Sequence, residues 1–150
     1  MPQSLSKILI HFVTSTKNRQ LLLTSAICPE LYAYIATTLN ALDSHALKIG
    51  GTEDHIHILL VLSKNYSLAK IAEEFKKSSS KWIKTKGDEF HDFGWQNGYG
   101  GFSISQSHAE DVIRYIETQQ EHHRKMTFQE EYREFLRKYQ IPFDERYVWD

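Results

Sequence analysis

Two histidines are separated by a single residue within an apolar stretch of the chain. The segment DHIHILL contains His55 and His57. Because side chains alternate between the faces of a strand, both imidazoles are expected on one face, while Ile56 and Ile58 point to the other. Two neighbouring imidazoles can bind one divalent cation and leave its other positions to oxygen ligands. The alternative is that both histidines lie on a solvated face of a sheet.

A second candidate element lies near the end of the chain, where the sequence predicts a helix from Ser107 to Lys125. Along this helix one stripe is apolar except for its last residue, a glutamine. Its members are Ala109, Val112, Ile113, Ile116 and Gln120. Tyr115 lies off that stripe and shares a face with Gln119, one turn later. The two side chains can present a hydroxyl and an amide oxygen to the same point. A phenol near a divalent cation ionises more readily, which makes it a usable nucleophile.

The rest of the sequence predicts the elements that must position these side chains. Strands are expected over residues 8–16, 47–51, 52–62 and 99–105, and further helices over residues 29–42, 67–83 and 127–139. This order predicts an α+β fold of the ferredoxin-like type, an antiparallel sheet with helices packed on one face, to which a C-terminal tyrosine-bearing helix is added. We expect one domain over residues 1–150. Because many unrelated proteins share this plan, it does not specify a function.

The composition is that of an ordinary soluble protein. Of 150 residues, 41% are hydrophobic and 25% charged, and the formal net charge is −1. A net charge near zero argues against coating nucleic acid by bulk electrostatics, but it allows a local basic face. The chain has no apolar run long enough to cross a bilayer. Its one cysteine, Cys28, cannot form an intrachain disulfide, so we expect a reducing, cytoplasmic compartment.

Basic residues are concentrated at two places that could contact nucleic acid, and a third group follows the tyrosine. The candidate DNA-binding residues are Lys17, Arg19, Lys76, Lys77, Ser79, Lys81 and Arg124. Trp82 lies beside the second group, and we expect it to pack in the core rather than to contact DNA. His122 and His123 are expected to be solvated. For each basic group the alternative is a solvated surface without a partner.

Taken together, these segments resemble one known family along the whole chain. The order LSKILIHFVTSTKNR, GGTEDHIHILL, KKSSSKWIK, WQNGYGGFSIS, VIRYIETQQEHHRK and FDERYVWD is similar to that of the single-tyrosine HUH transposases of the insertion-sequence-two-hundred-like, hairpin-recognising group. In that name, HUH stands for His-hydrophobic-His. The joint occurrence of these segments is far more specific than the histidine pair alone.

The resemblance implies a set of roles. His55, His57 and Gln119 would be the ligands of a catalytic Mg²⁺ or Mn²⁺, and Tyr115 would be the nucleophile. Such proteins cut single-stranded DNA beside imperfect hairpins, form a 5′-phosphotyrosine link, and use the free 3′-OH to rejoin strands. The resemblance also implies a homodimer with active sites shared between chains, a prokaryotic cytoplasm and no nucleotide cofactor.

Two other functions fit parts of the pattern. A non-catalytic nucleic-acid-binding module of ferredoxin-like fold would not need Tyr115. A small hydrolase with a His-x-His metal site would release its product into water without a covalent intermediate.

Overall fold

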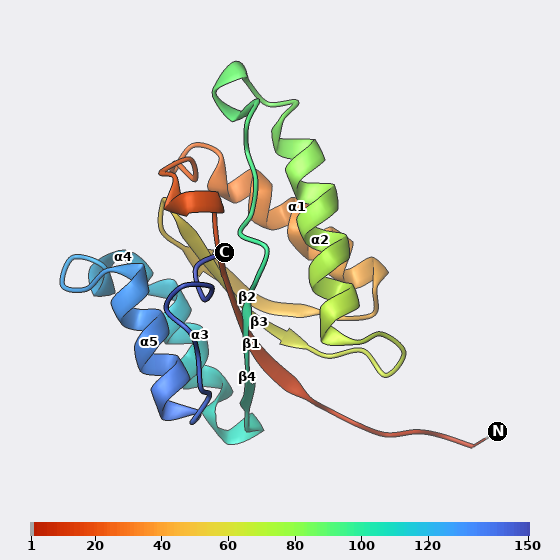
Figure 1. Cartoon of the computed structure of the whole chain (residues 1–150). Coiled ribbons are helices and arrows are strands. Elements are labelled where there is room, and N and C mark those ends of the chain that lie inside the picture. Colours follow the sequence, from red (N-terminus) through yellow and green to blue (C-terminus); the bar gives the residue numbers. More distant parts are fainter. Residues whose placement is uncertain (1) are drawn as a thin grey trace.

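The computed structural model describes residues 2–150 and shows a four-stranded antiparallel sheet between two layers of helices (Figure 1). The strands are β1 (Leu9–Ser15), β2 (Ala46–Gly51), β3 (His55–Val61) and β4 (Gly100–Ile104). The longer helices are α1 (Cys28–Ala41), α2 (Leu68–Ile83), α3 (Ala109–Glu117) and α5 (Phe128–Lys138), with a single turn, α4 (Gln119–His122), between the last two. The strand order β2-β3-β1-β4 is that of the ferredoxin-like plan, so the predicted fold is confirmed.

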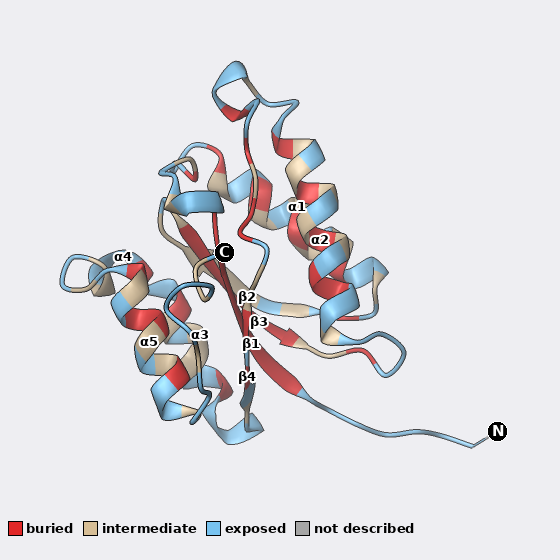
Figure 2. Cartoon of the chain, in the orientation of Figure 1, coloured by how far each residue is buried: buried red, intermediate tan, exposed pale blue. Residues whose placement is uncertain are grey.

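One face of the sheet packs against α1 and α2 in an apolar layer. Phe12 of β1 and Ile56, Ile58 and Leu60 of β3 are fully buried there. Figure 2 shows that β1 and β3, in the centre of the molecule, are buried along most of their length. Their partners from the two helices include Leu31, Ile35, Leu39, Ile71 and Phe75. Alternation along β3 therefore directs its even-numbered side chains into this layer, as predicted.

The opposite face of the sheet is covered by α3 and α5. Val13 and Phe102 pack with Phe128, Tyr132 and Leu136 of α5, which recur at helical spacing. Leu9 and Leu59 pack with Ala109 and Ile116 of α3. The odd-numbered residues of β3, which include both histidines, face this second layer.

Two glycines allow these helices to approach the sheet closely. A Cβ on Gly50 of β2 would lie 2.7 Å from the carbonyl oxygen of Ile116 in α3. A Cβ on Gly100 of β4 would lie 2.6 Å from the Tyr132 ring in α5. Both distances are shorter than ordinary carbon contacts, so a side chain at either position would force the helix away from the histidines.

The tyrosine-bearing helix is shorter than the sequence predicted. The continuous helix expected from Ser107 to Lys125 is interrupted at Thr118, where φ is −103° and ψ is 22°. Because of this break, Gln119 is buried while Gln120, which was placed on the apolar stripe, is exposed. The break turns Gln119 toward β3, where its Oε1 atom lies 3.1 Å from His55 Nε2.

Two of the predicted helix starts are confirmed by their caps. Ser67 accepts a hydrogen bond from the backbone N–H of Lys70, and Thr127 accepts one from that of Glu130. At the C-terminus, the Asp150 carbonyl accepts a hydrogen bond from the backbone N–H of Gly98, and Trp149 packs near the helix α5. Within residues 2–150, every helix is too short or too polar to cross a membrane.

Candidate active site

His55 and His57 lie side by side beneath α3, α4 and α5, and neither side chain is exposed to solvent. This excludes the alternative that they lie on a solvated sheet face. Unpaired polar groups are costly to bury, so each ring nitrogen is expected to have a partner. The two rings are close, with centroids 5.1 Å apart.

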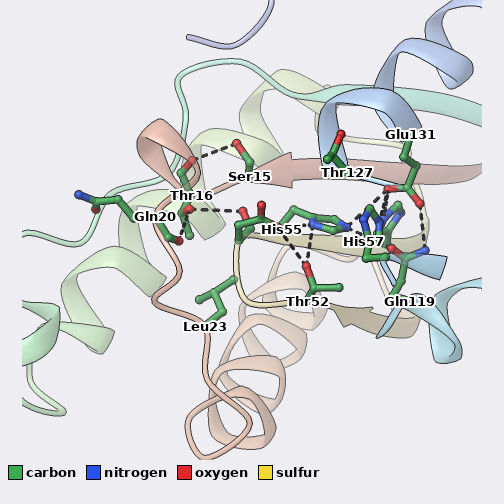
Figure 3. A network of polar contacts seen from close by, with 12 residues as sticks. Ser15, Thr16, Gln20, Leu23, Thr52, His55, His57, Gln119, Thr127 and Glu131 are labelled. Atoms are coloured by element: carbon green, nitrogen blue, oxygen red, sulfur yellow. Dashed lines mark hydrogen bonds and ion pairs between the residues drawn. The ribbon is translucent and has the colours of Figure 1, made fainter. Parts of the chain in front are cut away.

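The Nε2 atoms of both rings point to a common region of the site (Figure 3). His55 Nε2 lies 3.1 Å from Gln119 Oε1, and His57 Nε2 lies 3.0 Å from Glu131 Oε1. His123 contributes a third imidazole to this region. One ligand atom from each of His55, His57, His123 and Glu131 can be chosen so that all four lie within 4.8 Å of one another. This spacing fits a single cation between them.

The Nδ1 atoms of the two rings are held by different groups. His55 Nδ1 lies 2.7 Å from a carboxylate oxygen of Asp54 and 2.9 Å from the Thr52 hydroxyl. His57 Nδ1 lies 2.7 Å from Nε2 of His11, a buried residue of β1. A carboxylate can only accept, so the neutral His55 ring carries its proton on Nδ1 and leaves the Nε2 lone pair for a cation.

His11 can hold the His57 ring by its Nδ1 atom, as Asp54 holds the His55 ring. Burial, followed by the neighbouring His57, lowers the pKa of His11 to about 3, which keeps its ring neutral. A neutral His11 can accept a hydrogen bond from the Nδ1–H of His57 through its own Nε2 atom. His57 Nε2 is then left with a free lone pair that faces Glu131.

Glu131 of α5 is the carboxylate at the centre of the site. It is 1% exposed. Although burial opposes ionisation, the neighbouring imidazoles of His123, His57 and His55 lower the pKa of Glu131 well below its usual range. Its second oxygen, Oε2, accepts hydrogen bonds from the Tyr115 hydroxyl and from Gln119 Nε2. Tyr115 and Gln119 therefore meet at one carboxylate.

The phenol of Tyr115 is neutral at rest. Burial, followed by the charge of Glu131, raises the pKa of Tyr115 well above its usual range. Its ring stacks on His122 at 4.5 Å between centroids. Tyr115 lies near His57 of the same chain, and the centroids of the two rings are 5.8 Å apart.

His123 provides a test of whether these residues fit a metal ion. Its Nε2 atom is buried and forms no hydrogen bond with the described residues, although it lies 3.2 Å from Glu131 Oε1. An unpaired buried nitrogen that faces two imidazoles and a carboxylate is suited to a cation. The donor set therefore fits the metal that the resemblance implies. The expectation that His123 is solvated is wrong, because α4 and the following turn fold it onto the site.

The candidate DNA-binding residues lie on different sides of the molecule. Lys77 and Lys81 are exposed on α2, on the side of the sheet away from the histidines. Lys17 is exposed after β1. Arg19 and Arg124 line a pocket of about 590 Å³ that also includes Asp54 and His123. These two arginines are therefore the candidates nearest to the cluster.

Two of the candidates on α2 have structural partners. Ser79 is fully buried, where its hydroxyl donates to the Phe75 carbonyl and accepts from the Trp95 indole N–H. The prediction that Ser79 contacts DNA is therefore corrected, because its side chain does not reach the surface. The ammonium of Lys76 donates to the carbonyls of Gln96 and Gly98 and so anchors that loop. Burial lowers the pKa of Lys76 to about 8.

Sequence reasoning did not find His11, His123 or Glu131 as members of the site. One signal was available for Glu131, which is an acid on the stripe formed by Phe128, Tyr132 and Leu136. A similar signal was available for His11, which lies between the apolar residues Leu9 and Val13 on one face of β1. A titratable residue on the buried face of an element is uncommon unless it is paired.

Known structures share this fold. A Deinococcus radiodurans protein described as a transposase superposes with a TM-score of 0.62 at 17% identity, over 79% of this chain and 98% of that chain. The structure of a REP-associated tyrosine transposase bound to a REP hairpin superposes with a TM-score of 0.60 at 15% identity, over 82% of this chain and 73% of that chain. At these identities the likeness shows the fold alone. The curated proteins contained no match to the sequence.

The sequence itself matches a family model described as "Transposase IS200 like" over residues 4–119. The matched region extends from the segment before β1 to Gln119, so it includes both histidines and Tyr115. Residues 120–150, which carry His123 and Glu131, lie beyond it. Because the match spans well over half of the chain, this protein belongs to the IS200-like transposase family.

Proposed function

We propose that the protein binds the hairpin ends of an insertion sequence and cleaves and rejoins single-stranded DNA through a 5′-phosphotyrosine intermediate. The observation that carries this proposal is the convergence of Tyr115, Gln119 and the two histidines on Glu131. A nucleophile beside a cluster suited to a divalent cation is the arrangement that phosphodiester transfer needs. A solved neighbour of similar fold is described as a tyrosine transposase bound to a REP hairpin.

In the proposed reaction, the Tyr115 oxygen bonds to the scissile phosphorus as the bond to the 3′ oxygen breaks. Glu131, which accepts the hydrogen bond of the Tyr115 hydroxyl, orients the phenol, and the phenolic proton is released to water as the new bond forms. The 3′ oxygen departs as a hydroxyl after taking up a proton. Rejoining reverses these steps, with a 3′-OH attacking the tyrosine link.

His55, His57 and Gln119 are proposed as the protein ligands of Mg²⁺ or Mn²⁺. When bound, the cation would polarise the phosphate and stabilise the charge on the departing oxygen. Asp54 and His11 hold the two rings so that Nε2 faces the site.

The pocket beside the cluster is proposed to hold the strand next to the scissile phosphate. Arg19 and Arg124 supply its positive charge. Lys17, Lys77 and Lys81 are exposed elsewhere and are proposed to contact the hairpin backbone.

The test is incubation of the purified chain with labelled single-stranded hairpin DNA from the element's ends, with Mg²⁺ or Mn²⁺. We expect an adduct that resists SDS and disappears in Tyr115→Phe. The matched control is Tyr147→Phe, because Tyr147 is exposed and away from the cluster. Cleavage without an adduct would indicate a hydrolase. Binding without cleavage in both metals would indicate a non-catalytic module, and either result would overturn the proposal.

We also propose a homodimer with active sites shared between chains. A mixture of His57→Ala and Tyr115→Phe tests the sharing, since an exchanged dimer restores one complete site from two defective chains. Recovered adduct formation in the mixture, together with a dimeric mass in solution, supports this arrangement. An inactive mixture would show that each tyrosine serves its own chain, as it is placed within the single chain here.

A further inference from the structure

The segment beyond the family match supplies a charged group to the cluster. Helix α5 is held on the sheet by Phe128, Tyr132 and Leu136, and Gly100 leaves space for the Tyr132 ring. Glu131 lies on the same buried side of this helix, so the packing that fixes α5 also directs a carboxylate between the imidazoles. Its position therefore follows from the apolar stripe of α5 rather than from a flexible loop.

The burial of Glu131 needs a positive partner. An ionised carboxylate without compensation is among the costliest groups to remove from water. Within residues 2–150, no lysine or arginine forms an ion pair with Glu131, and its charged contacts are His55, His57 and His123, at 3.5, 3.0 and 3.2 Å. Imidazoles that bind a cation through Nε2 are neutral, so the cation itself would balance the carboxylate.

The two oxygens of Glu131 have different partners. Oε1 faces the three imidazoles, whereas Oε2 accepts from the Tyr115 hydroxyl and the Gln119 amide. A cation bound at Oε1 would thus be joined to the nucleophile through one rigid carboxylate. The unpaired Nε2 of His123, buried on the same side, is a second observation that points to a ligand at this place.

We propose that Glu131 and His123, from the part of the chain beyond residue 119, are additional ligands of the metal site, and that Glu131 also positions Tyr115. This inference rests on the proposed function for the identity of the site. It assigns to the C-terminal segment a direct part in metal binding, beyond the His55, His57 and Gln119 set.

The enlarged donor set also bears on the identity of the metal. Mg²⁺ prefers oxygen ligands and keeps several waters, whereas imidazole nitrogens suit transition metals. Three imidazoles with one carboxylate therefore favour Mn²⁺ over Mg²⁺. We expect the protein to bind Mn²⁺ at least about tenfold more tightly than Mg²⁺.

The experiment measures Mn²⁺ binding to the purified full-length chain without DNA, by the loss of the free-ion EPR signal and by calorimetry. We expect Glu131→Gln, which keeps the shape and removes the charge, to weaken Mn²⁺ binding at least about tenfold. His123→Ala should weaken it in the same direction. The matched control is Glu134→Gln, an exposed carboxylate on the same helix, which should bind Mn²⁺ like the wild type.

Circular dichroism and a thermal melt of each metal-free variant show whether it folds. If Glu131→Gln fails to fold, Glu131→Asp replaces it, since the shorter carboxylate keeps the charge and withdraws the ligand atom. Unchanged Mn²⁺ affinity in a folded Glu131 variant would overturn the inference, even if the wild type forms its DNA adduct. An absent adduct in the wild type would instead overturn the proposed function, so the two failures are distinguishable.

Discussion

The two faces of strand β3 are both fully buried from His55 to Leu60 but are stabilised in different ways. On one face Ile56 and Ile58 pack against α1 and α2, and burial alone stabilises the contact. On the other, His55 and His57 are covered by helices whose nearest side chains are polar or charged. The apolar face is stabilised by close packing of its side chains, whereas on the histidine face every buried nitrogen and oxygen requires a polar partner or a cation. Changes on the first face should therefore reduce stability, and changes on the second should reduce metal binding and catalysis.

The largest expected effect is on the apolar face. Ile58→Ala leaves a cavity beneath α1 and α2 and should lower the free energy of unfolding by about 2–5 kcal/mol. Chemical denaturation measures this change, and Leu47→Ala, at a half-exposed position of β2, is the control. A loss below about 1 kcal/mol would mean that this face is not the main source of stability. The surviving folded fraction should still bind Mn²⁺.

Metal removal should act through the other face. At a free Mn²⁺ concentration of about 100 times the dissociation constant, binding stabilises the folded chain by about 2.7 kcal/mol. A chelator should therefore lower the melting temperature of the wild type and of Ile58→Ala alike. In His57→Ala the chelator should have almost no effect. If the chelator lowered the melting temperature of His57→Ala as much as that of the wild type, the ion would bind at a site other than the histidine cluster.

The support of the two imidazoles can be compared directly. Asp54→Asn removes the carboxylate that holds the Nδ1 proton of His55, and it should weaken Mn²⁺ binding by about 10–100-fold. His11→Phe removes the neutral partner of His57 and should weaken binding less, because the lost hydrogen bond is uncharged. Calorimetry measures both. A larger loss in His11→Phe would reverse this ranking.

The smallest expected effect is on DNA affinity, when single basic residues on either side of the sheet are replaced. Arg124 lines the pocket beside the cluster, whereas Lys81 lies on α2 across the sheet. Arg124→Ala should weaken binding of single-stranded DNA and lower the slope of log affinity against log salt by about 0.7, the value for one phosphate contact. Lys81→Ala should change the affinity for unpaired DNA less and that for the hairpin more. Equal effects of both variants on both substrates would indicate only diffuse charge.

Most of the scaffold could be predicted from local patterns. The alternation in DHIHILL placed both histidines on one face, and the caps at Ser67 and Thr127 marked helix starts, because these signals act between neighbours in sequence. The break at Thr118 could not be predicted, since the periodicity continues through it. The residue after the break, Gln119, contacts His55, which lies 64 residues away in the sequence.

The site was predicted only in part for the same physical reason. Tyr115 and Gln119 were recognised as a pair because they lie one helical turn apart. The contacts of His57 with His11 and with Glu131 join positions 46 and 74 residues apart, which no local pattern reports. A buried titratable residue on an apolar stripe was the available signal for both partners.

The proposed function requires that Tyr115 forms a covalent bond with DNA at a metal-dependent site. The most direct measurement is mass spectrometry of the peptide isolated from the protein–DNA adduct after proteolysis and nuclease digestion. We expect a nucleotide 5′-phosphate on Tyr115, formed with Mn²⁺ or Mg²⁺ and absent when a chelator is added. A phosphate on another residue, or cleaved DNA with Tyr115 unmodified throughout, would contradict it.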